Sequence, residues 1–493
     1  MYFLGIDIGS SSIKIALIAS KTGKNISTVQ EPKTEMPITA AKKGWAEQDP
    51  EAWWNHICKG IQRIKKENQV TSNQISGVGI AYQMHGLVLV DDTGTLLRNS
   101  IIWCDSRAVV IGDKAFGEIG KRYCENQLLN SPANFTASKL KWVRQNEPDV
   151  YARIHKIMLP GDYIAFRFSN QINTTVSGLS EGIFWDFKSD TLSKELLDYY
   201  DISEKVIPEL VETFSVQSIV SEQGANESGL AAGTPILYRA GDQPNNALAL
   251  NIFNPGEVAA TGGTSGVMYA VTDNLSVTEC ARVNNFAHVN HKVGGQKRIG
   301  KLLCINGSGI QYRWLLNNLS VASYEEMNQL ATDTAVGTDG VCLLPFGNGA
   351  ERMLGNKNVG TRILNLDLNR HHKGHLCRAA LEGIAFSFVY GFEIMKSDGV
   401  VPKVIRAGND NLFRSQIFGE TIATLLGESI EIYNTTGAIG AARACILKEG
   451  DYDTFTSFLS NDHIATFTPL NNASAYETAY QAWKKELQLI TKE

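Results

Sequence analysis

The sequence predicts an α/β fold of two similarly built domains whose glycine-rich turns face each other across a cleft. The chain has 493 residues, and a domain usually holds about 100 to 200, so two domains are expected. The same β-hairpin construction occurs early in each half, at residues 2–19 and 257–271. A strand, a glycine turn and a helix follow one another at residues 404–426, which is typical of α/β proteins.

Composition and charge exclude several classes of protein. Lys and Arg total 46 and Asp and Glu total 51, a net charge of −5 without a long basic run, so nucleic acid and anionic membrane are poor partners. The apolar start, Met1 to Asp7, lacks a basic leader, so we expect neither a signal peptide nor a membrane span. The eight cysteines are scattered singly, which favours reduced thiols in a cytoplasm over a disulfide frame or a zinc site.

The first hairpin carries a carboxylate at the mouth of its turn. Two β-rich runs flank Gly9-Ser10-Ser11-Ser12, with Asp7 before the turn and Lys14 after it. The serines of such a turn can simply solvate a surface hairpin. Alternatively, Asp7 can hold a hydrated Mg²⁺ while the N–H groups and hydroxyls of the turn meet phosphate oxygens.

A histidine lies where two further strands meet. Small apolar residues lead to Gln83-Met84-His85-Gly86, and a second apolar run follows. A single histidine usually has a structural role, but at a strand end beside a glycine His85 can donate a hydrogen bond to a sugar hydroxyl. Upstream, Asp49 and Pro50 predict the start of a helix whose apolar face, from Trp53 to Ile64, belongs to the core.

A second carboxylate, Asp242, precedes a second glycine-rich turn. The strand at residues 234–240 delivers Gly241-Asp242-Gln243 to its end, and Gly262-Gly263-Thr264-Ser265-Gly266 comes about twenty residues later. Glycines let N–H groups approach an anion, and a carboxylate beside them can take a proton from an attacking hydroxyl. A loop carboxylate alone is more often structural, so other segments must decide. A domain boundary is expected between residues 244 and 254, before Pro255.

Two further patterns imitate ligand sites. Residues 295–302 match the spacing of a Walker A phosphate loop until Leu302 replaces the Ser or Thr that would bind Mg²⁺, so we expect a basic hairpin turn there. His371, His372 and His375 lack an accompanying carboxylate or cysteine ligand set. We expect these histidines to be solvated at the start of the long helix that follows.

Together these segments resemble the FGGY family of carbohydrate kinases over nearly the whole chain. The hairpin around Asp7, the stretch from Trp45 to Pro50, Gly241-Asp242 and the second glycine-rich turn occur in the family's order. Residues 139–146 fit most of the family's first signature, and residues 375–382 fit the end of its second. The element Gln83-Met84-His85-Gly86 is similar to that of members acting on D-xylulose.

The resemblance implies two actin-like ATPase (ribonuclease H-like) domains that face each other across a cleft. Residues 1–245 would bind mainly the sugar and end in the catalytic aspartate. Residues 254–445 would bind mainly ATP, and residues 446–493 would form a helical tail packed on the second domain. We expect the sugar and ATP as partners, with a homodimer as a possibility.

The resemblance also implies an activity and roles for individual residues. The activity is ATP-dependent phosphorylation of a ketose, first of all D-xylulose to D-xylulose 5-phosphate, with ATP and Mg²⁺ as cofactors. Asp242 would be the base that deprotonates the sugar hydroxyl, and Asp7 would help to place Mg²⁺. The sugar would be contacted by Gln83, Met84, His85 and Gln243. The nucleotide would be contacted by Ser10, Lys14, Thr264, Gly307, Gln311, Gly408 and Asn411.

The nucleotide site, the acceptor and the presence of catalysis each leave an alternative open. The family's glycine triplet at the adenosine site reads Arg406-Ala407-Gly408 here, so only Gly408 is carried over from it. The acceptor can be another family substrate, such as ribulose, gluconate or glycerol. A non-catalytic actin-like protein that binds sugar or nucleotide is the third interpretation, and the presence of both Asp7 and Asp242 argues against it.

Overall fold

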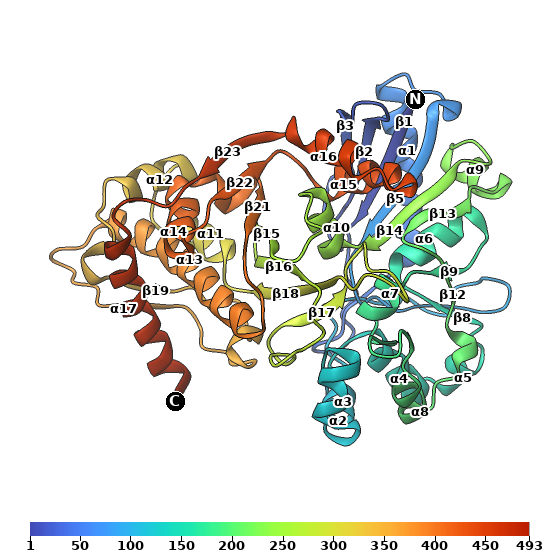
Figure 1. The fold of residues 1–493 in the computed structure, drawn as a ribbon, viewed down its shortest axis with the longest axis horizontal. Coiled ribbons are helices and arrows are strands. Elements are labelled where there is room, and N and C mark those ends of the chain that lie inside the picture. The colour runs from blue at the N-terminus through green and yellow to red at the C-terminus, as the bar shows by residue number, and fades with distance from the viewer. Residues whose placement is uncertain (493) are drawn as a thin grey trace.

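The chain forms two bodies, each built around a mixed β-sheet (Figure 1). The structure, a computed structural model, describes residues 1–492, with the backbone alone at Asn411 and Glu449. We call the body around the six-stranded sheet the first domain and the body around the seven-stranded sheet the second domain. None of the described helices is long and apolar enough to cross a membrane.

The two sheets repeat one arrangement of strands. In the first sheet, β1 (Tyr2–Ile8) is antiparallel to β2 (Ile13–Ala19) and parallel to β5 (Ile75–Tyr82); β3 (Asn25–Glu31) follows β2, and β14 (Pro235–Gly241) and β13 (Phe214–Ile219) follow β5. In the second, β15 (Glu257–Gly262) is antiparallel to β16 (Gly266–Thr272) and parallel to β21 (Val404–Gly408). Beyond these lie β18 (Ile299–Ile305) and β17 (Asn284–Ala287) on one side and β22 (Ile430–Tyr433) and β23 (His463–Phe467) on the other. The prediction of two similar hairpins, one in each half, is confirmed.

Helices and short strand pairs surround the first sheet. The predicted helix begins as expected, because the Asp49 carboxylate accepts the Glu51 N–H at 2.9 Å and Pro50 takes the first position. Its apolar face from Trp53 to Ile64 is buried. The helices are α1 (Pro50–Glu67), α2 (Val109–Ile119), α3 (Lys121–Tyr123), α4 (Thr136–Asn146), α5 (Pro148–Ala152), α6 (Pro160–Ser169), α7 (Val176–Glu181), α8 (Lys194–Tyr200), α9 (Glu222–Ser228) and α10 (Asp242–Ala249). The short pairs are β4 (Glu47–Gln48) with β7 (Ser100–Ile101), β6 (Val88–Val90) with β8 (Lys156–Met158), β9 (Asn173–Thr174) with β12 (Glu209–Leu210), and β10 (Trp185–Asp186) with β11 (Thr191–Leu192).

The second domain packs around one long buried helix, α13 (Lys373–Ser397). Residues 295–302 form the end of a turn and the start of β18, as the hairpin interpretation of that stretch requires. Further elements in the second half of the chain include α11 (Gly309–Asn318), α12 (Tyr324–Thr332), β19 (Cys342–Leu344) with β20 (Arg362–Leu364), the 3-10 turns η5 (Arg352–Leu354) and η6 (Asn411–Arg414), α14 (Gln416–Leu426), α15 (Gly437–Ala444), α16 (Tyr452–Ser460) and α17 (Ala473–Lys492).

Two helices from the second half of the chain pack on the first domain. Helix α15 follows the second sheet in sequence but lies against β1, β2 and β5 of the first (Figure 1). A Cβ on Gly5 would lie 1.9 Å from the Ala438 carbonyl oxygen, and one on Gly79 would lie 1.9 Å from that of Ala441. Only glycine allows this approach of helix to sheet. The packing therefore departs from the expected division at residues 445 and 446, since α15 and α16 join the first domain and β23 and α17 the second.

Candidate active site

Asp242 lies where the two domains meet. Strand β14 ends at Gly241, and Asp242 opens α10, whose Ala247 and Leu250 pack with Ala259 of the second sheet. Burial, reinforced by the nearby Asp7 carboxylate, raises the pKa of Asp242 to about 7, against hydrogen bonds from Gln243. A carboxylate with a pKa near neutrality is suited to accept a proton from a hydroxyl.

Asp7 and Lys14 face each other across the first hairpin, as Cα partners of β1 and β2. Burial raises the pKa of Asp7, and Lys14 opposes that rise. Lys14 also lowers the pKa of Asp410, a second-domain carboxyl whose pKa burial raises. Because one cation acts on carboxyl groups of both domains, the first hairpin turn opens toward the second domain.

The carboxylates present fit a hydrated magnesium ion. Mg²⁺ usually keeps several waters and binds through one or two carboxylates plus phosphate oxygens. Asp7 and Asp242 are both partly exposed, and Asp7 is close enough to raise the pKa of Asp242. In the part of the chain that the structure describes, no group of three or more His, Cys, Asp or Glu side chains forms an all-protein metal cage.

The Ser10 turn rests on a buried amide network. Gln48 Nε2 donates to the Ser10 carbonyl at 2.6 Å, and Gln83 Nε2 donates to Gln48 Oε1 at 3.0 Å. Trp103 Nε1 lies 3.4 Å from Ser10 Oγ. The Gln83 side chain is only 2% exposed, so it lies buried beneath the Ser10 turn.

His85 is held in an unusual backbone conformation by buried groups. Its φ of 63° is in the left-handed region, its N–H donates to Glu181 Oε2 at 3.1 Å, and its carbonyl accepts from Lys139 Nζ at 2.8 Å. Nδ1 lies 3.0 Å from the Glu181 carbonyl, which can only accept, so we assign the proton to Nδ1 and leave Nε2 as an acceptor. Burial, followed by Lys139, lowers the pKa of His85 to about 3.

Glu181 links His85 to the strand that carries Asp242. A Cβ on Gly241 would lie 2.5 Å from Met84 Cγ and 3.3 Å from Glu181 Oε2. Burial raises the pKa of Glu181 well above its usual range, and Asp242 adds to the rise. The arrangement brings the predicted residues Met84, His85 and Asp242 together. Sequence reasoning did not single out Glu181, because nothing in its local sequence marks it, and it assigned no individual role to Lys139 within the stretch that fits the family's first signature.

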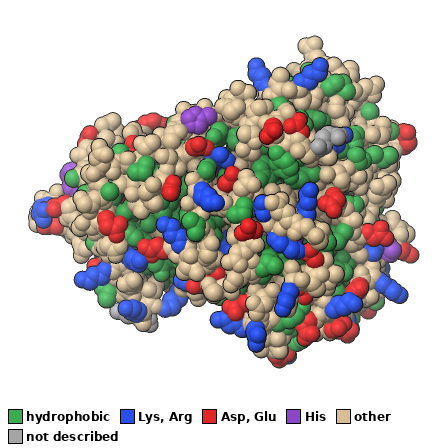
Figure 2. Space-filling view, in the orientation of Figure 1, with side chains coloured by type: hydrophobic (Ala, Val, Ile, Leu, Met, Phe, Trp, Pro, Cys, Tyr) green, Lys and Arg blue, Asp and Glu red, His purple; other side chains and the backbone are tan. Residues whose placement is uncertain are grey.

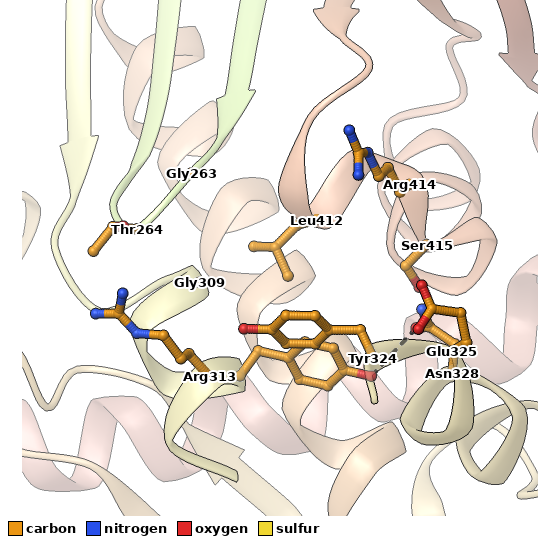
Figure 3. A pocket seen from close by; sticks show the side chains of 11 residues that line it. Gly263, Thr264, Gly309, Arg313, Tyr324, Glu325, Asn328, Leu412, Arg414 and Ser415 are labelled. Atoms are coloured by element: carbon orange, nitrogen blue, oxygen red, sulfur yellow. Dashed lines mark hydrogen bonds between the residues drawn. The ribbon is translucent and has the colours of Figure 1, made fainter. Parts of the chain in front are cut away.

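The second hairpin turn docks on a helix start. The N–H groups of Gly309 and Ile310 donate to the carbonyls of Gly263 and Thr264 at 3.1 and 3.0 Å. Thr264 borders a pocket of about 330 Å³, with Arg313 below it on α11 and Arg414 and Ser415 across the opening (Figure 3). The pocket also contains residues that sequence patterns did not single out: Tyr312, Tyr324, Glu325, Asn328 and Leu412.

The other predicted nucleotide residues divide into two groups. Gly307 precedes α11, and its N–H donates to Glu351 Oε1 at 2.8 Å. Gln311 lies in the first turn of α11, and its Oε1 accepts from Thr361 Oγ1 at 2.9 Å. Gly408 ends β21, and a Cβ added there would meet Asp410 and Thr435 at an ordinary contact distance of 3.9 Å. Asn411 begins η6, but its side chain lies outside the described residues.

The three neighbouring histidines serve the start of α13. His372 is its N-cap and accepts the Gly374 N–H at 3.2 Å. His371, expected to be solvated, instead has a side chain that is 2% exposed, because it packs against Asp339. These contacts account for the histidines without a metal.

A mixture of charges covers the face of the molecule that Figure 2 shows, with acidic and basic side chains interspersed. That distribution agrees with the net charge of −5. It gives this face no extended basic surface of the kind that binds nucleic acid.

Comparisons with known proteins identify the family. A model of the FGGY family of carbohydrate kinases, N-terminal domain, matches residues 2–249, half of the chain. Xylulose kinase of Haemophilus influenzae is 27% identical over 99% of this chain and 100% of its own length. The crystal structure of xylulose kinase from Rhodospirillum rubrum superposes with a TM-score of 0.88 at 23% identity, covering 100% of both chains. Plasmodium falciparum glycerol kinase with ADP gives the same TM-score at 20% identity, covering 99% of this chain and 98% of its own.

These similarities confirm the expected fold of two actin-like ATPase domains. They also agree with the repeated strand order of the two sheets. Because the family model spans half of the chain, and the relative's similarity extends over nearly all of it, the chain belongs to the FGGY family of carbohydrate kinases.

Proposed function

We propose that this carbohydrate kinase transfers a phosphoryl group from ATP to a ketose, with D-xylulose as the first candidate and D-xylulose 5-phosphate as the product. The observation that carries the proposal is Asp242, a partly exposed carboxyl with a pKa of about 7 that lies where the two domains meet. The curated relative described above, named as a xylulose kinase, supports this acceptor.

In this proposal Asp242 is the general base. Its carboxylate takes the proton of the acceptor hydroxyl as that oxygen attacks the transferred phosphorus. Phosphoryl transfer depends mainly on positioning and charge neutralisation, and a general base adds about 10²- to 10⁴-fold. Gln243 hydrogen-bonds to Asp242 and orients it.

The acceptor would lie beside Met84 and His85. Neutral His85 offers Nε2 as an acceptor for a sugar hydroxyl, because its Nδ1 faces the Glu181 carbonyl. Glu181 and Lys139 fix the histidine backbone from behind. Gln83 would act indirectly, through Gln48 and the Ser10 turn.

The nucleotide would occupy the pocket beside Thr264, with its phosphates between the two hairpin turns. The glycerol kinase of equal TM-score was solved with ADP, which supports this placement. Asp7, with Asp242 close by, would hold a hydrated Mg²⁺, which neutralises phosphate charge when bound. Lys14 would add a second positive charge at the same phosphates.

A panel of acceptors tests the proposal. ADP release is measured with D-xylulose, D-ribulose, D-gluconate and glycerol at equal concentrations, each against a sugar-free control. We expect kcat/KM to be highest for D-xylulose. Greater ADP release with another acceptor would mean that this acceptor, and not D-xylulose, is the substrate. Nucleotide binding without any acceptor-dependent ADP release would favour a non-catalytic protein.

A further inference from the structure

The wall around His85 includes residues of the second domain. The His85 ring meets Phe135 edge-on at a centroid distance of 4.7 Å and Phe286 at 5.2 Å. Phe286 belongs to β17, an edge strand of the second sheet. The His85 ring is therefore packed against residues of both domains.

Strand β17 is fixed to the first domain by polar contacts. The Asn285 N–H donates to Asn130 Oδ1 at 2.8 Å, and Asn285 Nδ2 donates to the Leu129 carbonyl at 2.9 Å. Ser177 Oγ donates to the Ala287 carbonyl, and the Ala287 N–H donates to Ser180 Oγ, at 2.9 and 2.8 Å. These paired bonds fix Phe286 against His85.

Arg352 is a cation that the second domain holds at this wall. Its guanidinium carbon lies 6.0 Å from the centre of the Phe135 ring. It is close enough to lower the pKa of His85, and it lowers that of Cys304, whose pKa Asp242 raises. The guanidinium is thus near both the sugar-facing histidine and the surroundings of the proposed base.

The backbone of Arg352 is anchored by its neighbour. Glu351 is fully buried and accepts the N–H groups of Asn306 and Gly307 at 2.9 and 2.8 Å. Those residues lead into α11, on whose start the Gly263–Gly266 turn docks. Glu351 therefore connects the segment of Arg352 to the helix that borders the Thr264 pocket.

The guanidinium is partly buried but not fully paired. Nε donates to the Ala281 carbonyl and Nη2 to the Cys280 carbonyl, both at 3.1 Å. A guanidinium has five N–H donors, and within the described residues it has no carboxylate partner. Burial lowers the pKa of Arg352. A buried charge without a counter-charge costs free energy, and such a cost is typical of a group reserved for a ligand.

We propose that Arg352 is a specificity-determining residue that donates hydrogen bonds to oxygen atoms of the acceptor sugar from the second-domain side. The two carbonyls fix the plane of the guanidinium, and its remaining N–H groups form a fork that suits two neighbouring oxygens. Phe135 and Phe286 are buried, 4% and 0% exposed, and their rings fix the His85 ring from behind. This inference rests on the proposed function, because it deepens the same acceptor site.

Steady-state kinetics of the full chain test the inference, with KM for D-xylulose and KM for ATP measured separately. We expect Arg352→Met to raise the KM for D-xylulose about 10- to 100-fold, the range expected for losing hydrogen bonds from a charged group. The KM for ATP should stay within about twofold, because Arg352 lies outside the nucleotide pocket. Arg352→Lys keeps the charge without the fork and should fall between Arg352→Met and the unaltered chain.

Arg282→Met is the matched control. Arg282 lies next to the Ala281 carbonyl but pairs with Glu279, at 2.6 Å, so its loss should leave both KM values unchanged. Thermal unfolding checks that each variant is folded, and Arg352→Lys retains the test if Arg352→Met does not fold.

The outcomes separate the inference from the proposed function. Unchanged sugar KM in Arg352→Met, or a fall confined to kcat, would overturn the inference and assign the guanidinium to packing or to the phosphoryl group. If the unaltered chain prefers D-gluconate and Arg352→Met loses that preference, the inference holds while the ketose is replaced by a sugar acid. If the unaltered chain releases no ADP with any acceptor, both the proposed function and this inference are wrong.

Discussion

The two hairpin turns are alike in local sequence and differ in what surrounds them. Gly9-Ser10-Ser11-Ser12 lies between Asp7 and Lys14 and is supported by the Gln48 amide. Gly263-Thr264-Ser265-Gly266 is docked on the start of α11 and borders a pocket lined by Tyr312 and Tyr324. In the proposed function the first turn would serve the metal site, and the second would serve the nucleotide pocket. The difference comes from neighbouring side chains.

The largest expected effect comes from removing the carboxylate between the turns. Asp242→Asn keeps the shape but cannot accept a proton, so kcat should fall about 10²- to 10⁴-fold with little change in ATP binding. Single-turnover phosphoryl transfer and nucleotide binding are measured on the folded variant. Near-normal turnover would reject Asp242 as the base. It would also mean that the carboxylates near the two turns do not explain how the turns differ.

The pH dependence tests the same carboxylate without a mutation. Burial and Asp7 raise the pKa of Asp242 to about 7, so the basic form is lost as pH falls below that value. We expect kcat/KM for the sugar to fall about tenfold per pH unit below pH 7 and to reach a plateau above it. A profile that is flat between pH 5 and 8, roughly the range in which the base should titrate, contradicts this assignment.

A smaller effect should follow from lifting the second turn off its helix. In Gly309→Ala the new Cβ would lie 2.3 Å from the Gly263 carbonyl oxygen, so the turn must move and ATP contacts should weaken. We expect the KM for ATP to rise about tenfold and the sugar KM to stay constant. Gly117→Ala, where no atom of the described residues lies within 4 Å of the new Cβ, is the control. Equal changes in both KM values would mean that the turns do not divide the substrates.

The smallest expected effect concerns the support of the first turn. Gln83→Leu removes the 3.0 Å bond to Gln48 beneath Ser10, so the KM for Mg-ATP should rise about three- to tenfold, as for one neutral hydrogen bond. The sugar KM should not change. A rise in sugar KM alone would show instead that Gln83 contacts the sugar, as the family resemblance implies.

Much of the fold followed from local sequence. The hairpins, the cap at Asp49, the delivery of Asp242 by a strand and the helix after residue 372 each depend on residues within a few positions. Their backbone hydrogen bonds and periodic burial are encoded where they form. The pairing of two turns with two carboxylates could therefore be predicted without knowing the packing.

The sequence by itself determined the repeated hairpins, Asp7 at the mouth of the first, Asp242 at the end of a strand, and the family's order of motifs. Only the tertiary structure decided which distant groups complete the site. Glu181 reaches the N–H of His85 across 96 positions, and Lys139 reaches its carbonyl across 54. The transfer of α15 to the first sheet likewise depends on Gly5 and Gly79 meeting carbonyls more than 300 residues away. Such contacts depend on how separate elements fit and bury one another. The local periodicity of the sequence therefore does not predict them.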